Sequence, residues 1–360
     1  MGTKWGTLGV MHLIVDAREA FSPQRTGKGE WSFHVIQELL RRSGVRCTLL
    51  TDRPVDGLGG GSRVVVLPTG WRWHLAAQTF VRGAHDVTAY VSPTSYIVPF
   101  LLGKSVPTVV VVHDLIAFRP EPHALRPRLL ERLTLPRVVR TAALLCTASE
   151  TTSRDLLGYF PRARHDKVVA VFAGPVQDAG AQSAKPDVVL SLGTLCPRKN
   201  QLRLTQAYAK LPAALRERYP LVVVGGRGWQ DEAILREIER TPGARWEGYL
   251  RGDALDALWS RAAVLAMPSL YEGFGMPVLT AMQRGIPVLA SSRGSLIEVT
   301  GDAAVSVDPL SVESIADGLL RLLQEEPLRE RLVQEGKKRA QVFSWERTVG
   351  LVVEGIERAC

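Results

Sequence analysis

Short apolar runs rich in β-branched residues recur along the chain and alternate with longer stretches of helical periodicity. Within each run the apolar residues are continuous, which is typical of strands buried on both faces of a parallel sheet. The pattern therefore predicts an α/β protein built from βαβ units. The expected strands are LIVD at 13–16, VVVLP at 64–68, AYVSP at 89–93, TVVVVHD at 108–114, KVVAVF at 167–172, VVLSLG at 188–193, YPLVVVGG at 219–226, AAVLAMPS at 262–269 and IPVLASS at 286–292.

Four stretches between these runs place Leu, Ile and Val at helical spacing, and we expect each to form a helix. An apolar stripe on such a helix is ordinarily core, so we expect these stripes to be buried. The expected helices cover residues 33–42, 128–140, 201–211 and 314–324.

The middle of the chain changes in composition. The segment FAGPVQDAGAQSAKPD at 172–187 loses apolar periodicity in favour of Gly, Ala, Pro, Ser and Gln, which is typical of a linker. A chain of 360 residues also suits two domains better than one. We therefore expect one domain over residues 1–177 and a second over 178–344, with no internal repeat.

Composition narrows the function classes. Lys plus Arg total 45 against 36 Asp plus Glu, and the net charge of +9 favours an anionic partner, although solubility explains it equally well. The four cysteines form no CxxC pair, so the pattern indicates neither a zinc site nor a disulfide framework. No run approaches the roughly 18 apolar residues of a membrane span, and the N-terminus lacks an export pattern.

A basic loop, GTLCPRKNQ at 193–201, follows one expected strand and precedes a helix. It sets Arg198 and Lys199 beside the first helical turn, where free backbone N–H groups already favour an anion. Two adjacent cations there indicate a clamp for a diphosphate. A solvated basic helix start capped by Asn200 explains the loop equally well.

A glycine-rich loop, YEGFGMP at 271–277, likewise joins a strand to a helix. Gly273 and Gly275 allow the backbone to approach a ligand closely, and Glu272 offers an acceptor for sugar hydroxyls. Taken alone, the motif is more typical of an ordinary strand-to-helix turn.

Three further loops carry weaker signals. Gly27 and Gly29 suit a backbone cradle at a helix start, but the P-loop signature is incomplete. His113 ends an expected strand, where a lone histidine is more often structural than catalytic. The sequence GGRGWQDE at 225–232 has Asp231 where a dinucleotide fingerprint needs its third glycine, which argues against an NAD-dependent dehydrogenase.

Eight stretches taken in order resemble the family 4 retaining glycosyltransferases of the GT-B fold, and most closely the bacterial polysaccharide and lipopolysaccharide mannosyltransferases. The likeness is dense over 188–309 and looser over 14–174. The eight stretches are TGKG, VVHDLIAF, SLGTLCPRKNQLRLTQAYAKL, LVVVGGRGW, WEGYL, MPSLYEGFGMPVLTAM, GIPVLASS and EVTGDAAVSVDP.

The resemblance implies an α/β architecture of two Rossmann-like domains whose parallel sheets face a central cleft. The N-terminal domain, residues 1–177, is then expected to bind the acceptor, and the C-terminal domain, residues 178–344, the nucleotide-sugar donor. The ending FSWERTVGLVVEGIERA resembles the family's last helix, so we expect residues 345–360 to cross back onto the N-terminal domain.

The resemblance also implies residue roles. Arg198 and Lys199 are expected to hold the donor diphosphate, and Glu272 to contact the transferred sugar. His113 is expected to approach the sugar, which makes these four the expected catalytic residues. The remaining expected donor contacts are Gly27 and Gly29 near the phosphates, backbone N–H groups around Phe274, Gly275 and Met276, and Tyr249 with Leu250 near the base.

One position departs from the family pattern. Members usually carry a second Glu eight positions after the first, where it holds the ribose hydroxyls, but this chain has Thr280 there. A hydrogen bond to a charged group contributes about 1.5–3 kcal/mol against about 1 for a neutral one, so donor affinity is expected to be roughly tenfold lower unless another group compensates.

The resemblance thus implies a hexosyltransferase that needs no cofactor. No loop carries a DxD-type carboxylate pair, and we expect no metal. The expected reaction moves mannose from GDP-mannose, with a UDP-linked donor as the other choice, to a polysaccharide or lipid-linked glycan. We expect a cytoplasmic protein, peripheral at the inner face of the membrane and without a nucleic-acid partner.

Two questions stay open at this stage. The first is whether Thr280 marks a nucleotide-sugar-binding protein of the same fold with weak or no turnover. The second is whether Trp71, Arg72 and Trp73 meet a lipid-linked anionic acceptor or pack on their own domain.

Overall fold

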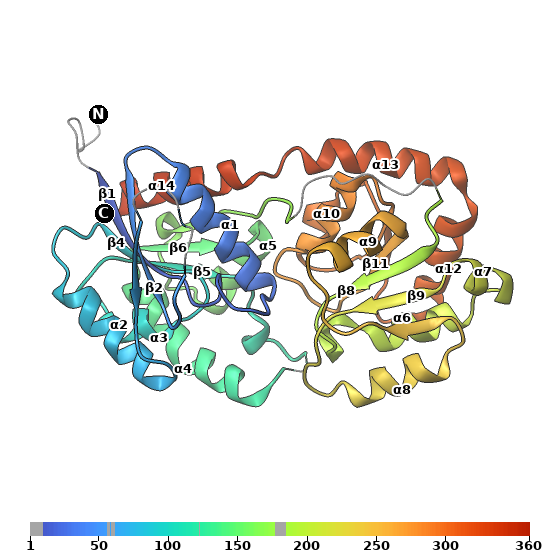
Figure 1. Cartoon of the computed structure of the whole chain (residues 1–360), viewed down its shortest axis with the longest axis horizontal. Helices are drawn as coiled ribbons and strands as arrows, with labels where there is room; N and C mark the ends of the chain where they lie inside the picture. Colours follow the sequence, from blue (N-terminus) through green and yellow to red (C-terminus); the bar gives the residue numbers. More distant parts are fainter. Residues whose placement is uncertain (1–9, 56–57, 59–61, 122, 177–184) are drawn as a thin grey trace. The chain divides into compact units, whose positions relative to one another are not determined.

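The computed structural model describes residues 10–55, 58, 62–121, 123–176 and 185–360. The contacts between residues divide the chain into two compact units (Figure 1). The first unit comprises residues 1–118, 126–173 and 345–360, and the second comprises 119–125 and 174–344. The chain changes unit between residues 173 and 174, inside the expected linker, whereas the expected boundary at 177–178 lies outside the described residues.

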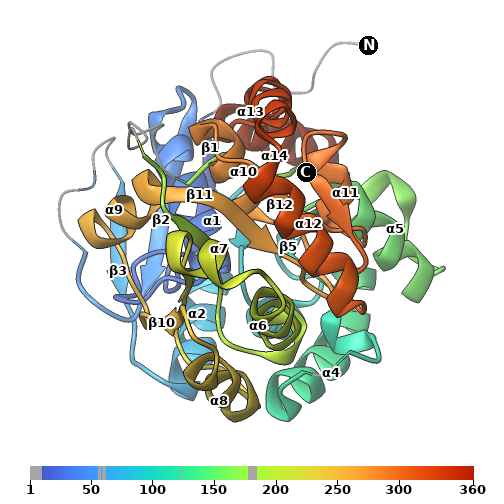
Figure 2. The ribbon, with the colours of Figure 1, turned by 90° about the vertical axis from the view of Figure 1, so that its right-hand side faces the viewer.

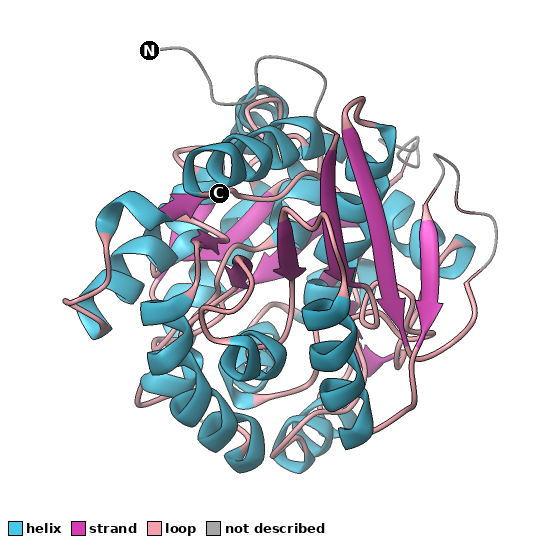
Figure 3. Cartoon of the chain, turned by 90° about the vertical axis from the view of Figure 1, so that its left-hand side faces the viewer, coloured by secondary structure: helices cyan, strands magenta, loops and turns pink. Residues whose placement is uncertain are grey.

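The first unit contains a seven-stranded sheet in the order β3-β2-β1-β4-β5-β6-β7. Every pairing in it is parallel, as continuous apolar strands require (Figure 3). Its strands are β1 Met11–Asp16, β2 Val45–Thr51, β3 Arg63–Val66, β4 Ala89–Ser92, β5 Thr108–Val112, β6 Leu144–Thr147 and β7 Val168–Ala170.

Helices pack on this sheet and bury its apolar residues. Tyr90 of β4, for example, is fully buried with Trp73 of α2. The last helix of the chain, α14, contacts α1, β6 and β7, so it is part of this unit. The helices are α1 Gly27–Arg41, α2 Trp71–Gly83, α3 Ile97–Leu102, α4 Leu125–Thr141, α5 Glu150–Tyr159 and α14 Trp345–Ala359.

The second unit contains a six-stranded sheet in the order β10-β9-β8-β11-β12-β13, again with parallel pairings throughout (Figure 2). Its strands are β8 Val188–Leu192, β9 Leu221–Val224, β10 Ala244–Trp246, β11 Ala262–Met267, β12 Val288–Ser291 and β13 Val305–Val307.

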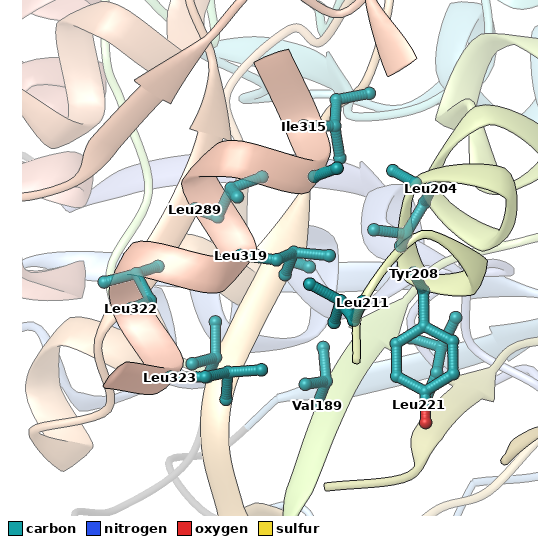
Figure 4. Packing of buried hydrophobic residues seen from close by; sticks show 14 of the residues in the cluster. Val189, Leu204, Tyr208, Leu211, Leu221, Leu289, Ile315, Leu319, Leu322 and Leu323 are labelled. Atoms are coloured by element: carbon teal, nitrogen blue, oxygen red, sulfur yellow. The ribbon is translucent and has the colours of Figure 1, made fainter. Parts of the chain in front are cut away.

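One face of this second sheet packs against α6, α8 and α12. Figure 4 shows side chains of α6 and α12 against the strands. Gly318 lets α12 lie close to the strands, because a Cβ at that position would come within 2.8 Å of Val307 and 2.9 Å of Leu289. The helices of the unit are α6 Gln201–Ala209, α7 Ala213–Arg218, α8 Glu232–Arg240, α9 Asp253–Arg261, α10 Met276–Arg284, α11 Ser295–Thr300, α12 Val312–Gln324 and α13 Glu326–Ala340. Across the described residues, no helix of either unit combines the length and apolarity needed to cross a membrane.

The structure adds four strands to the nine expected runs, namely β2, β6, β10 and β13. It also corrects the expectation that the apolar stripe of residues 128–140 is buried throughout. Leu135, Val138 and Val139 of α4 are buried, but Leu129 and Leu133 of the same helix are exposed. The polar contacts of α4 with the Ala117 carbonyl and with Lys28 explain this orientation.

The segment that contains Trp71, Arg72 and Trp73 is the first turn of α2. Trp73 has no exposed surface, and its Nε1 donates a hydrogen bond to the Thr51 carbonyl at 3.1 Å, whereas Trp71 is exposed. Trp73 therefore packs on its own unit and is not available to an acceptor.

Candidate functional site

Three loops of the second unit meet at the carboxyl edge of its sheet, where open parallel sheets bind ligands. Asn200, which precedes α6, links them. Its Nδ2 donates to the carbonyl of Pro268 after β11 at 2.8 Å and to that of Pro309 after β13 at 2.7 Å. One of the two interpretations of this loop made Asn200 the cap of α6, but its side chain makes no capping bond and instead holds these loops together.

Arg198 and Lys199 lie on the short 3₁₀ turn before α6, and both contact Glu272 in the loop after β11. Arg198 Nη1 lies 2.9 Å from Glu272 Oε2, and Lys199 Nζ lies 2.6 Å from Oε1. Each carboxylate oxygen thus has its own cation. The structure brings together three of the four residues that the sequence singled out for catalysis.

The loop geometry around this cluster is fixed by the backbone. The Arg198 carbonyl accepts a hydrogen bond from Leu270 N at 2.8 Å, and Arg198 Nη1 donates to the Tyr271 carbonyl at 2.9 Å. Gly193 has φ +144°, and a Cβ there would lie 3.0 Å from Lys199 Cε. The glycine therefore leaves the space through which the Lys199 side chain reaches Glu272.

The charges in the cluster do not cancel. Glu272 is 6% exposed, and burial alone would raise its pKa, but Lys199 and Arg198 outweigh burial and hold the pKa of Glu272 below its ordinary value. The carboxylate is therefore ionised at neutral pH. Two cations and one carboxylate leave a net charge of +1, so this edge of the sheet can still attract an anion.

The glycine-rich turn after Glu272 is shaped by Gly275, which has φ +108° and precedes the first residue of α10. Ser295, the first residue of α11, donates its hydroxyl to the Glu272 carbonyl at 2.7 Å and to the Phe274 carbonyl at 3.1 Å. Sequence reasoning missed Ser295, and its position directly after a glycine that follows a strand is the only local signal.

The other residues of this segment that were expected to contact the donor differ in burial and in their partners. Met276 is half-buried at the start of α10, while the Phe274 side chain is buried against Phe343 with ring centres 5.5 Å apart. Thr280 is 2% exposed, and its Oγ1 accepts a hydrogen bond from Val176 N at 3.4 Å. The Thr280 oxygen thus already has a backbone partner, and its expected role toward ribose stays a prediction.

Tyr249 and Leu250 follow β10, the edge strand that is separated from β11 by β9 and β8. Both are half-buried. The preceding Gly248, with φ +72°, accepts a hydrogen bond from Gly225 N at 2.8 Å, which ties this loop to the end of β9. Tyr249 and Leu250 thus lie at the same carboxyl edge of the sheet as Glu272, but three strands away from the strand that Glu272 follows.

His113 belongs to the first unit and follows β5. Its Nε2 donates to the Pro93 carbonyl at 2.7 Å, so Nε2 carries the proton and Nδ1 carries the lone pair. Burial, together with the charge of Lys28, lowers the pKa of His113 to about 4. The ring is therefore neutral at pH 7 and can accept a hydrogen bond from a hydroxyl.

Gly27 and Gly29 lie in the first turn of α1, also in the first unit. A Cβ at Gly29 would lie 2.7 Å from the Glu19 carbonyl, so Gly29 is required for close packing of the helix start. Trp31 in the next turn contacts His113 edge-on at 5.4 Å. The first unit thus groups His113 with the start of α1.

A polar cluster at the carboxyl end of β1 escaped the sequence reasoning. Arg18 makes a two-pronged bond to the buried Asp16, at 3.0 and 2.8 Å, and its guanidinium lies 3.5 Å from the centre of the Trp73 ring. An Asp at the end of an apolar strand, in LIVDAR, is the signal that could have found it.

No group of three or more His, Cys, Asp or Glu side chains within the described ranges is placed to hold a metal ion. The positive charge at the carboxyl edge of the second sheet is supplied by Arg198 and Lys199.

The chain is similar to known proteins in sequence and in fold. Residues 176–339 match the family described as "Glycosyl transferases group 1". O-antigen chain mannosyltransferase B from Escherichia coli is 34% identical over 275 residues, which cover 71% of each chain.

Solved structures share the fold at low identity. Sucrose-phosphate synthase from Thermosynechococcus elongatus superposes with a TM-score of 0.78 at 17% identity, covering 96% of this chain and 98% of that one. HepE from Anabaena, solved with UDP-glucose, has a TM-score of 0.74 at 17% identity over the same shares. The two parallel sheets thus form the GT-B fold, and the chain belongs to the group 1 glycosyltransferases.

Proposed function

We propose that this glycosyltransferase is a retaining, metal-independent mannosyltransferase that uses GDP-mannose and extends a polysaccharide or lipid-linked glycan. One observation carries the proposal, which is the cluster of Arg198, Lys199 and Glu272 at the carboxyl edge of the second sheet. The choice of mannose is supported by the similarity to O-antigen chain mannosyltransferase B.

The cluster suits the chemistry of a nucleotide-sugar. Breaking a glycosyl-phosphate bond develops negative charge on the leaving diphosphate, so preorganised cations stabilise the transition state more than the ground state. Arg198 and Lys199 supply two such charges from the protein, which is the basis for proposing that no metal is needed. Glu272 orients both cations and accepts a hydrogen bond from a sugar hydroxyl.

The proposal assigns no protein side chain as the base that takes the proton of the acceptor hydroxyl, and the donor phosphate takes this role. This assignment sets the stereochemical course. The acceptor hydroxyl attacks on the face that the diphosphate leaves, its proton passes to a donor phosphate oxygen, and the configuration at the sugar carbon is retained. In this proposal neutral His113 accepts a hydrogen bond from a sugar hydroxyl through Nδ1.

Removing one cation tests this role. We expect Lys199→Ala to lower sugar transfer and donor hydrolysis by about 100-fold, in the range measured for loss of one preorganised group. The assay is release of labelled sugar from the donor, with and without acceptor. Lys210→Ala is the matched control, since Lys210 directly follows α6 and pairs with Glu313 at the surface, at 3.0 Å. Tight donor binding by the wild-type chain without turnover would instead support a binding protein.

The donor base is tested separately, because the solved neighbour HepE was crystallised with UDP-glucose. Thermal stability is measured with GDP, UDP, ADP and their sugars, and the proposal expects stabilisation confined to GDP compounds. Stabilisation confined to UDP compounds would overturn GDP-mannose and leave the glycosyltransferase assignment intact.

A lipid-linked acceptor would bring the protein to a membrane surface, and peripheral association with the inner leaflet is part of the proposal. The net charge of +9 supports attraction to anionic lipid.

A further inference from the structure

Helix α4 carries four of its five leucines on the outside. Leu129, Leu130 and Leu133 are 61%, 44% and 74% exposed, and Leu125 one turn earlier is exposed as well. Among the described residues, no other helix has more than two exposed large apolar side chains. Exposed apolar residues scattered singly need no explanation, but a row along one helix indicates a contact surface.

Polar contacts hold the helix in this orientation. Arg128 Nε and Arg132 Nε both donate to the Ala117 carbonyl, at 3.2 and 2.7 Å. Glu131 lies on the inner side, 17% exposed, with Oε1 3.9 Å from Lys28 Nζ. Rolling the leucines inward would break these bonds, so the apolar face stays turned to solvent.

The charge of the outer face is of one sign. Arg126, Arg132, Arg137 and Arg140 are exposed on α4, whereas the only acidic residue of the helix is Glu131 on the inner side. At 100° per residue these arginines fall within about 80° of Leu129 on either side. Arg132 is also held by the Ala117 carbonyl, and the Arg137 guanidinium lies 5.0 Å from the centre of the Phe100 ring, so we assign the charge beside the leucines to Arg126 and Arg140.

We propose that this face, Leu129, Leu130 and Leu133 with Arg126 and Arg140 beside them, docks on the surface of an anionic lipid bilayer. A helix with apolar residues on one side and basic residues beside them lies in the membrane interface, with leucines among the upper acyl chains and arginines at the phosphates. Charge complementarity favours lipid over a protein partner, because the uniformly positive border matches a surface that is negative everywhere. The inference deepens the proposed membrane association and is independent of which sugar is transferred.

The surface differs from the one that the sequence suggested. Trp73 is buried and unavailable to lipid, and only Trp71 of that pair is exposed, on α2. The leucine face of α4, and not the segment that the sequence offered to a lipid-linked acceptor, therefore carries the proposed membrane contact.

Vesicle sedimentation tests the proposal with the full-length chain. The vesicles contain phosphatidylcholine with or without phosphatidylglycerol. We expect binding only when phosphatidylglycerol is present, and binding that weakens as salt is raised, because surface charge is screened. Leu129→Ser with Leu133→Ser, and separately Arg126→Glu with Arg140→Glu, are each expected to weaken binding about tenfold or more.

Matched controls separate the surface from general effects. Leu75→Ser removes an exposed leucine from α2 of the same unit, and Arg41→Glu with Arg46→Glu makes the same change of net charge elsewhere on it. Both controls are expected to bind like the wild type. Circular dichroism and donor hydrolysis confirm that each variant is folded, which separates failure of this surface from failure of the proposed function.

Three outcomes would overturn the docking face. The wild type does not bind phosphatidylglycerol vesicles at low salt; or the double-serine variant binds them as the wild type does; or gel filtration shows a dimer that the double-serine variant abolishes while vesicle binding is unchanged. The last outcome would assign the leucines to a second copy of the chain.

Discussion

At the scale of single residues, the feature that sets the candidate site is the sharing of one carboxylate between two cations. Glu272 holds Arg198 and Lys199 in place, yet it also neutralises part of the charge that a diphosphate would meet. Because the pKa of Glu272 is lowered, the cluster adds stability at neutral pH and loses it as the pH falls below the ordinary value of 4.5. Anchoring and competition are therefore properties of the same side chain.

Glu272→Gln separates the two properties. We expect GDP to bind about threefold to tenfold more tightly, because both cations lose the carboxylate that competes with the diphosphate. We expect transfer to fall at least about tenfold, because a contact to the sugar and the fixed position of the cations are lost. Calorimetric titration and initial rates measure the two effects.

Glu313→Gln is the control for this variant, since Glu313 pairs with Lys210 at the surface and has no link to the cluster. If nucleotide affinity falls in Glu272→Gln in parallel with the rate, the carboxylate acts only as an anchor, and competition is refuted.

At the scale of elements, apolar runs predicted the central strands because those strands are buried on both faces. The strands that escaped are short or polar: β10 has three residues, and β2, VRCTLLT, mixes Arg, Cys and Thr into its apolar positions. Helix α4 was misjudged for a different reason. Periodicity predicts that a helix has an apolar side, but only its partners, here the Ala117 carbonyl and Lys28, decide which side faces the core.

The turn before α10 gives a test at this scale. Gly275→Ala is expected to cost at least about 2 kcal/mol of unfolding free energy, because φ is +108° and the new Cβ would lie 2.5 Å from Leu296 Cδ2. Urea unfolding followed by circular dichroism measures the change.

Gly226→Ala is the matched control on another loop of the same edge, where no described residue other than its chain neighbours comes within 4 Å of the added Cβ and φ is not in the left-handed region. It is expected to stay within about 1 kcal/mol of the wild type. Equal stability of the two variants would show that the turn relaxes without cost.

At the scale of the whole molecule, sequence reasoning depended on the order of motifs more than on any single one. Neither RKN nor EGFG alone distinguished a ligand site from an ordinary turn, and Glu272 lies 73 residues beyond Lys199. Their contact follows from strand order, since β8 and β11 are neighbours in the sheet. The partner of Thr280, Val176 N, could not be anticipated because no local pattern links the two segments.

The last helix supplies a test of unit membership. Ile356 on α14 is fully buried in the first unit, so Ile356→Ala is expected to destabilise that unit by about 2–5 kcal/mol. Hydrogen exchange should accelerate in α1 and β6 and leave α12 unchanged. Leu319→Ala on α12 is the counterpart, for which the reverse pattern is expected. Acceleration in α12 alone by Ile356→Ala would contradict the packing of α14.

The return of α14 to the first unit also sets the order in which the two units are completed during translation. Most of the first unit emerges early, but its closing helix, Trp345–Ala359, is translated only after residues 174–344 of the second unit. Nearly all of the second unit forms one continuous stretch, 174–344. It can therefore fold while α1 and β6 still lack the helix that packs on them, which is α14. The second unit is therefore complete in sequence before the first, and the core of the first unit stays incomplete until α14 has been translated.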